Sequence, residues 1–220
     1  MVAAVVVLTL DNGGKEEVAL EQSNTVGRKL FFGRDNIVAA IIPDGVTTIA
    51  EYAFGECTSL ASLTIPEGVT TIGAFAFSEC TSLASLTIPV GVTTIGEGAF
   101  LVCTSLGSVT IPEGVTTIRA SAFYECTSLG SVTIPAGVTT IGNEAFCGCS
   151  SLASVIIPSS VTTIGEYAFY GCSSLVSVKI PEGVTTIRAG TFEACRRLEQ
   201  VMILSPFAQL YRFSFEDCNS

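Results

Sequence analysis

Histidine and tryptophan are absent from this 220-residue chain, and charged residues make up only 14% of it. Without histidine, the side chain best suited to acid–base chemistry near neutral pH and to metal binding is missing. Basic residues are scarce: ten Lys and Arg stand against twenty Asp and Glu, a net charge of −10. Nucleic-acid binding needs a basic footprint for the phosphates. The composition argues against an enzyme, a cofactor site and a nucleic-acid partner.

Long hydrophobic runs are also missing, although 48% of the residues are hydrophobic. The longest run is Val2–Leu8, whereas a membrane-spanning helix needs about 20 apolar residues. We therefore predict no membrane span. The apolar start lacks the cationic head of a signal peptide, so we interpret it as mature structure.

The acidic charge is concentrated in the middle of the chain. Residues 35–178 hold eleven acidic residues and one basic residue, Arg119, while the two ends are each balanced. Such a charge suits solubility, and the alternative is a preference for a cationic partner.

A 23-residue period governs most of the sequence. Ile-Pro pairs recur at this spacing from Ile42-Pro43 to Ile180-Pro181, and VTTI occurs seven times. Phenylalanines keep the same period, at Phe54, Phe77, Phe100, Phe123, Phe146, Phe169, Phe192 and Phe215. A fixed period of this length indicates a repeat solenoid.

Within one unit, the Leu-x-x-Leu-x-Ile segment at residues 60–65 predicts a half-buried strand that Pro66 ends. Val69–Ile72 predicts a second extended piece, and Ala76-Phe77 begins a short helical or 3₁₀ turn. Because stacked coils share a continuous core, we predict a right-handed α/β solenoid of about eight coils. A parallel β-sheet covers one face, and short strands and helical turns cover the other.

The x-IP-x-x-VT-x-IG-x-x-AF-x-x-C-x-x-L pattern over about residues 30–220 resembles the BspA-type, or treponemal-class, leucine-rich repeats. The resemblance implies a horseshoe-like solenoid that works in adhesion or protein–protein contact and has no catalytic residues to carry over. Members are common on cell surfaces of bacteria and protists and also occur inside cells.

The two ends depart from the repeat, and three segments result. Residues 1–36 are expected to form an N-terminal cap, with Val2–Leu10 and Lys15–Leu20 as strands around an Asn12-Gly13 hairpin turn. Residues 37–203 form seven regular repeats. Residues 204–220 form a degenerate half repeat, whose aromatic residues could dock end to end on a second copy.

Eight of the nine cysteines follow the period, at Cys57, Cys80, Cys103, Cys126, Cys149, Cys172, Cys195 and Cys218. We interpret them as a file of buried free thiols, which does not converge as a zinc site requires. Free thiols favour a reducing compartment such as the cytoplasm, whereas the family resemblance favours the cell surface. Cys147 lies off the file, and we predict that it is the most accessible thiol.

Outward-facing strand positions supply the candidate binding residues. The first four coils repeat Ser and Thr, and variety appears only near the C-terminus. The predicted contact residues are Ser62, Thr64, Ser85, Thr87, Ser108, Thr110, Ser131, Thr133, Lys179, Arg196, Arg197, Glu199, Gln200 and Met202.

The leading hypothesis is a non-catalytic scaffold that binds another protein through the sheet face and the C-terminal coils. One alternative is an ice-binding solenoid that uses the flat Ser/Thr ladders. Another is a cell-surface adhesin that forms part of a longer protein.

Overall fold

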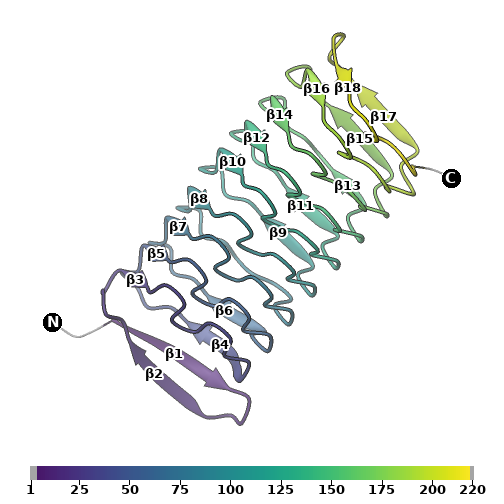
Figure 1. Cartoon of the computed structure of the whole chain (residues 1–220). Coiled ribbons are helices and arrows are strands. Elements are labelled where there is room, and N and C mark those ends of the chain that lie inside the picture. Colours follow the sequence, from purple (N-terminus) through teal and green to yellow (C-terminus); the bar gives the residue numbers. More distant parts are fainter. Residues whose placement is uncertain (1–3, 219–220) are drawn as a thin grey trace.

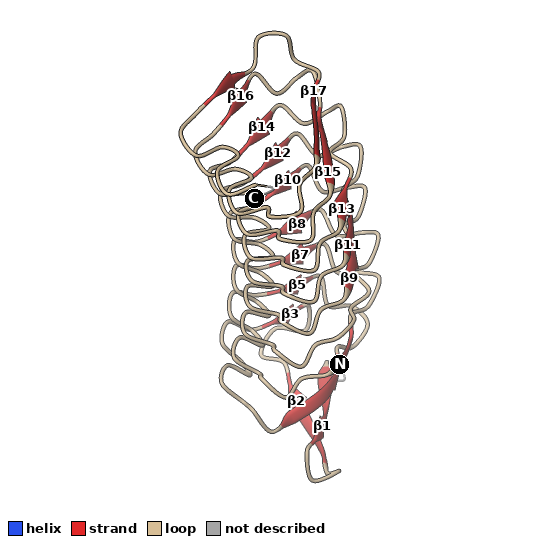
Figure 2. Cartoon of the chain, turned by 90° about the vertical axis from the view of Figure 1, so that its right-hand side faces the viewer, coloured by secondary structure: helices blue, strands red, loops and turns tan. Residues whose placement is uncertain are grey.

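A computed structural model describes residues 4–218 as one elongated stack of coils (Figure 1). Two files of short parallel strands run along the stack on different sides (Figure 2). The predicted solenoid with a parallel sheet on one face is confirmed. Neighbouring coils pair residues 23 apart, such as Ser131 with Ser154.

The sheet face carries one strand from most coils. After β4 (Ile37–Ile41) come β6 (Ser62–Thr64), β9 (Ser108–Thr110), β11 (Ser131–Thr133), β13 (Ser154–Val155), β15 (Ser177–Ile180) and β17 (Gln200–Ile203). Along each strand, inward residues such as Val109 are buried and outward residues such as Ser108 and Thr110 are exposed. This is the alternation of a half-buried strand.

The sheet is interrupted at one coil. Residues 85–87 form no strand, so the sheet divides into β2-β1-β4-β6 and β17-β15-β13-β11-β9. Figure 1 accordingly shows no arrow between β6 and β9. The sequence of this coil has the same Ser-Leu-Thr as β6, and no feature of that tripeptide explains the difference.

Two-residue strands form the second file. They are β3 (Thr25–Val26), β5 (Thr48–Ile49), β7 (Thr71–Ile72), β8 (Thr94–Ile95), β10 (Thr117–Ile118), β12 (Thr140–Ile141), β14 (Thr163–Ile164), β16 (Thr186–Ile187) and β18 (Gln209–Leu210). Threonine reinforces the file beside the strands: the Thr70 hydroxyl donates to the Thr47 carbonyl at 3.3 Å, and the Thr93 hydroxyl to the Thr70 carbonyl at 3.4 Å.

The third side of each coil is a chain of turns, so the expected helical or 3₁₀ turn is wrong for the described residues. Two residues in a typical coil have left-handed backbone, for example Ser121 (φ 53°) and Glu125 (φ 52°). The carbonyls of this side accept from the coil before, as when Phe123 N–H donates to the Ala145 carbonyl at 2.9 Å. Residues with left-handed backbone interrupt a helix. The spacing of apolar residues does not indicate where such residues lie.

Val102 is the most strained of these positions because a β-branched residue rarely takes positive φ, and here φ is 58°. The equivalent residue two coils later is Gly148, with φ 73°. We expect Val102→Gly to stabilise the chain by about 1 kcal/mol, seen as a higher melting temperature. Gly171→Val is the reciprocal control, because a Cβ there has room and only the backbone is penalised. A lower melting temperature for Val102→Gly would contradict the assignment of strain.

The core is a continuous stack of phenylalanine rings along the axis. Phe100, Phe123 and Phe146 are fully buried, with adjacent ring centroids 5.4 Å apart and nearly parallel planes. Offset stacks at this distance add to the energy of burial. Each ring thus supports the coil before it and the coil after it.

The N-terminal end is closed by an antiparallel hairpin of β1 (Val5–Leu10) and β2 (Lys15–Ala19). Strand β1 also pairs antiparallel with β4, so it covers the edge of the parallel sheet. Arg34 binds the Glu16 carboxylate at 2.7 and 3.0 Å, and this hydrogen bond lowers the pKa of Glu16. Val2 and Ala3, part of the expected first strand, lie outside the described residues.

At the C-terminal end of the stack, by contrast with the N-terminal end, apolar residues of the last coil are exposed. Val201, Leu210 and Phe207 are 41%, 57% and 82% exposed. Their counterparts one coil earlier, at positions 178, 187 and 184, are buried. Phe213 and Tyr211 are exposed beside them. The end of the stack therefore presents core-type side chains to solvent.

Candidate functional site

A hollow of about 490 Å³ lies between β15 and β17 on the sheet face. It is lined by Ser177, Val178, Lys179, Glu199, Gln200, Val201 and Met202. In-register pairing creates it, because Ser177 lies opposite Gln200 and Lys179 opposite Met202. The structure thus brings together four predicted contact residues. Val201 also lines the hollow but was not predicted as a contact residue. Its position in the 23-residue repeat, equivalent to that of Val178, predicted that it would be buried.

Arg196 and Arg197 lie in the turn before β17, and both are exposed. They are not among the residues that line the hollow. In the preceding coils the same positions hold Ser or Thr, so these two arginines give this end a positive charge that the middle lacks.

The hydroxyl-bearing residues are all exposed, as at Ser62, Thr64, Ser131 and Thr133. Strand pairing does not run through all of their coils, however. Ser85 and Thr87 lie on the interrupted coil, where they share a hollow of about 430 Å³ with Ser108 and Thr110. Both Ser and Thr pair between Ser108–Thr110 and Ser131–Thr133, and the serines alone pair onward through Ser154 to Ser177. The flat array of four coils therefore stays a prediction, with one of the four coils outside the strand pairing.

The periodic cysteines form a hydrogen-bonded file inside the stack. Each thiol donates to the carbonyl of the phenylalanine 26 residues earlier; Cys126 reaches the Phe100 carbonyl at 3.2 Å, and Cys149 the Phe123 carbonyl at 3.2 Å. All nine cysteines are free. Burial raises the pKa of the Cys57 thiol to about 11 and that of Cys126 to about 12. Buried thiols of this kind are poor nucleophiles.

Cys147, predicted to be the most accessible thiol, is only 8% exposed. It lies at the floor of a hollow whose other lining residues are Tyr124, Glu144, Tyr167, Tyr170 and Glu193. Burial, with Glu144 and Glu125 nearby, raises its pKa to about 12. The prediction is wrong because Cys147 has a short side chain that lies low between the larger residues that line the same hollow. Cys218 is the more exposed thiol.

A family model for the BspA-type leucine-rich repeat region matches residues 24–153 and 93–220. The chain belongs to the BspA-type leucine-rich repeat family. No curated protein matches it in sequence. The crystal structure of the T. pallidum leucine-rich repeat protein is similar, with 33% identity and a TM-score of 0.53, over 77% of this chain and 71% of that one.

Two further solved structures resemble this BspA-type chain more distantly. A leucine-rich cell surface protein from Faecalibacterium prausnitzii has 27% identity and a TM-score of 0.43, over 80% of this chain and 62% of that one. The pneumococcal vaccine antigen PcpA has 16% identity and a TM-score of 0.43, over 79% and 64%. The family is generally one of protein contact or adhesion and is generally non-enzymatic.

The BspA-type coils give a direct prediction for thiol labelling. In native protein at pH 8, Cys218 should react first with a thiol reagent, because it is the thiol that is not fully buried. Cys147 should react far more slowly, and the other seven only after unfolding. Because no Lys or Arg lies between Arg119 and Lys179, the labelled chain is digested with chymotrypsin, and tandem mass spectrometry after timed labelling assigns the label to each cysteine. Preferential labelling of Cys147 would contradict its burial, and Cys218→Ser is the control that should remove the fast phase.

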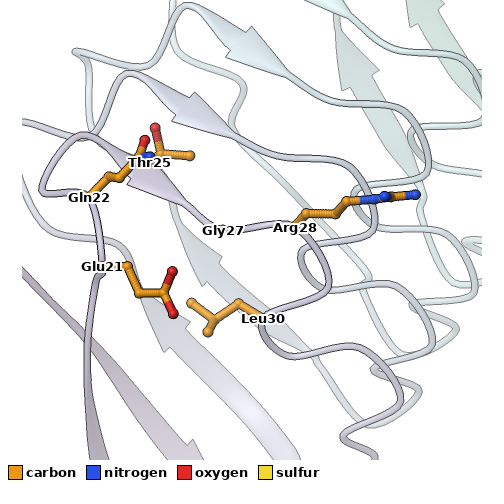
Figure 3. Close-up of a pocket in the computed structure, with 6 residues that line it drawn as sticks. All are labelled: Glu21, Gln22, Thr25, Gly27, Arg28 and Leu30. Carbon is orange, nitrogen blue, oxygen red and sulfur yellow. The ribbon is translucent and has the colours of Figure 1, made fainter.

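Another hollow, of about 350 Å³, lies at the N-terminal end of the BspA-type stack. Glu21 points across it toward Leu30, whereas the Arg28 side chain runs away from both (Figure 3). Arg28 pairs instead with Glu51 of the next coil, at 3.1 Å. The polar groups that line this hollow therefore do not converge on one ligand position.

The part of the chain that the structure describes has neither a clustered metal site nor a membrane-spanning helix. Within residues 4–218, no group of three or more Cys, Asp or Glu is placed to hold a metal ion. Over the same residues, no helix has the length and apolar character needed to cross a membrane.

Proposed function

We propose that this chain is a non-catalytic scaffold that binds another protein through its sheet face, at the C-terminal coils. The observation that carries the proposal is the hollow between β15 and β17, where Lys179, Gln200 and Met202 replace the repeated Ser and Thr. A repeat protein offers an extended surface, and residues that differ between coils can distinguish one partner from another.

The chemistry of this surface fits a protein partner. Met202 is 57% exposed and sits in the hollow as an adaptable apolar contact, a role that methionine often has at binding surfaces. Lys179 and Glu199 place both signs of charge at its edge, and Arg196 and Arg197 add positive charge nearby. Apolar contacts bordered by charges are typical of protein interfaces.

Site-specific photo-crosslinking tests the proposal. A photoreactive phenylalanine analogue at position 200 should crosslink one defined partner in the source cell, identified by mass spectrometry. Replacing Lys179, Arg196, Arg197 and Met202 by Thr, Thr, Ser and Thr, residues found at the same slots in other coils, should abolish that crosslink. Arg119→Gly is the matched control, because the equivalent residue in the next coil is Gly142. An undiminished crosslink from the fourfold variant would refute the site.

We also propose that the exposed C-terminal end associates with the same end of a second copy. Val201, Phe207 and Leu210 expose core-type side chains there, and residues 179–220 have five acidic and five basic residues, so two such ends do not repel. The hairpin closes the other end, which favours a closed dimer over a filament.

Light scattering after size-exclusion chromatography measures this association. A dimer that Phe207→Ser with Leu210→Ser converts to a monomer would support end-to-end contact. A monomer at every concentration tested would contradict it. Ile156→Ser is the matched control, since Ile156 is equally exposed at 82% but lies in the middle of the stack.

The ice-binding alternative is best supported on the second strand file. Thr48, Thr71 and Thr94 pair in register there, and threonine occupies this slot in every coil from Thr25 to Thr186, although strand pairing divides the file into three sheets. Thermal hysteresis and ice-crystal shaping of the purified chain test it. Their absence would exclude this function, and replacing Thr71 and Thr94 by Val should reduce any activity that is found.

We also propose the cellular compartment in which this chain works. Nine free thiols favour a reducing environment such as the cytoplasm, while the adhesin alternative requires display at the cell surface. Protease added to intact cells distinguishes the two: a tagged chain that survives supports the reducing compartment, and a chain that is cleaved supports the adhesin.

A further inference from the structure

The hollow above Cys147 has a regular origin in the stacking of coils. Tyr124, Cys147, Tyr170 and Glu193 occupy the same slot in four successive turns, which follow β10, β12, β14 and β16. Backbone hydrogen bonds keep them adjacent: Glu125 N–H donates to the Cys147 carbonyl, and Gly148 N–H to the Tyr170 carbonyl, each at 2.7 Å. One small side chain therefore lies between two tyrosines.

The gap between the two tyrosines is wide enough for a small ligand group. Adjacent parallel coils are about 4.8 Å apart, so the backbones that carry Tyr124 and Tyr170 are separated by about 10 Å across the coil of Cys147. Tyr167 provides a further wall, because its ring meets that of Tyr170 edge to face at 6.0 Å and 70°. The hollow measures about 360 Å³, within the range of small-ligand sites.

Three glycines lie next to residues that line the hollow or beside their side chains. Gly148 and Gly171 have φ of 73° and 68° at the slot where Glu125 lies one coil earlier. Gly190 allows the Tyr167 ring to lie over its backbone, and a Cβ on Gly190 would also meet the Glu193 carboxylate at 3.0 Å. The Tyr167 ring and the Glu193 carboxylate therefore lie beside the same glycine.

The charge of the hollow is entirely negative. Glu144 and Glu193 line it, and none of its six lining residues is basic. Burial raises the pKa of Glu193, and Glu216 and Asp217 add to this effect. The pKa of Tyr124 is also raised, by Cys147, by burial and by Glu125 and Glu144. Within residues 4–218, neither Glu144 nor Glu193 forms a salt bridge.

We propose that this hollow is a binding site for an organic cation, an alkylammonium or guanidinium group held between Tyr124 and Tyr170. Aromatic rings attract a cation within about 6 Å of the ring centre, and walls of several rings select such groups in known cages. A cation midway between the two tyrosines is about 5 Å from each. Glu144 and Glu193 add the opposite charge. The site lies on the turn side, so it is independent of the sheet-face proposal.

Titration with tetramethylammonium, followed by tyrosine fluorescence and by NMR, tests the proposal on the full chain. Choline is titrated in the same way, and its neutral counterpart is 3,3-dimethyl-1-butanol, which has the shape of choline without the charge. The cation should bind and the alcohol should bind at least about tenfold more weakly. Equal binding of the two, or no binding of the cation and of the peptides described below, would overturn the proposal.

Two substitutions of Cys147 distinguish a cage from a nonspecific acidic surface. Cys147→Tyr fills the gap between the tyrosines and should abolish binding, while Cys147→Ser keeps the gap and should bind as the wild type does. Both variants retain every carboxylate. Unchanged cation affinity in Cys147→Tyr, with a native circular dichroism spectrum, would refute the cage.

The aromatic contribution is measured with Tyr124→Leu and Tyr170→Leu together, since leucine occupies the same slot at Leu101. We expect at least a tenfold loss of affinity. Tyr52→Leu is the control, because Tyr52 stacks on Phe75 in another coil, and it should bind normally. Equal affinity in the double variant and the control would contradict the role of the rings.

A second titration identifies the source of the cation. Capped peptides that carry lysine, trimethyl-lysine or arginine are compared with free tetramethylammonium. Tighter binding of a peptide supports a side chain of a partner protein, and tighter binding of the free cation supports a small metabolite. Either result supports the cation site.

Discussion

Raising the pH from 8 to 10 is expected to unfold this chain at room temperature. The cause is the cysteine file, above all Cys80, Cys103, Cys126, Cys149 and Cys172, which are fully buried. Burial raises the pKa of each of these thiols, to about 12 for Cys126, because an ionised thiolate would lose its hydration in the core.

The direction of the effect follows from the raised pKa values. Thiols of the unfolded chain titrate near about pH 8.5, whereas the folded chain keeps its thiols protonated to higher pH. Their contribution to stability is complete below about pH 8.5 and is lost progressively as the pH rises. At pH 10 each deeply buried thiol costs about 2 kcal/mol, and the five together cost about 10 kcal/mol, similar to the whole stability of a typical domain.

Urea unfolding followed by circular dichroism, at pH values from 7 to 10.5 under reducing conditions, measures this loss. The midpoint should fall steeply above pH 8.5. Cys126→Ala should lower stability at pH 7 but reduce the alkaline loss by about 2 kcal/mol at pH 10. A midpoint independent of pH, or an unchanged slope in Cys126→Ala, would contradict the buried-thiol explanation.

Phe123→Ala should be among the most damaging single core substitutions that leave the charge unchanged. Phe123 is fully buried and stacks on Phe100 and Phe146, with centroids 5.4 Å away on each side. Loss of a buried phenylalanine costs about 3–5 kcal/mol, and the two lost stacks bring the expected total to about 5 kcal/mol. Denaturant unfolding measures the change.

Phe215→Ala is the matched control for the stack. Phe215 is only partly buried and stacks on one ring, that of Phe192, at 5.4 Å. The expected cost is therefore about 1–2 kcal/mol. Because repeat proteins gain stability from contacts between neighbouring coils, Phe123→Ala should also broaden the transition, as the two halves begin to unfold separately. Equal costs for both substitutions would mean that stacking along the axis contributes little.

Period and residue type were sufficient to predict the repeated part of the fold. Val109 and Val132 point inward, Ser108 and Ser131 point outward, and the thiols are free, as the 23-residue pattern indicates. The turn side was predicted wrongly because Ser121 and Glu125 adopt left-handed backbone. Spacing of apolar residues records which side chains are buried and contains no information about the sign of φ.

The candidate site residues were likewise predicted correctly in one part and wrongly in another. Lys179 and Met202 were identified because they depart from the repeat, and pairing in the sheet places them at one hollow. Cys147 was also identified as a departure, but its exposure was misjudged. Accessibility there depends on the size of Tyr124 and Tyr170 in the adjacent coils, and therefore on neighbours 23 residues away rather than on the local sequence.

The hydrogen-bonded ladders on all three sides of the coil restrict how the length of this protein can change. Thr70 N–H meets the Thr47 carbonyl, and Phe77 N–H meets the Ala99 carbonyl, so every rung joins residues at a fixed offset along the chain. Deleting one residue within a coil would misalign the rungs that this coil makes on both of its sides. Removing or copying a block of 23 residues would restore every rung. The protein can therefore lengthen or shorten only by whole coils, and gene duplication can change its reach without a new folding problem.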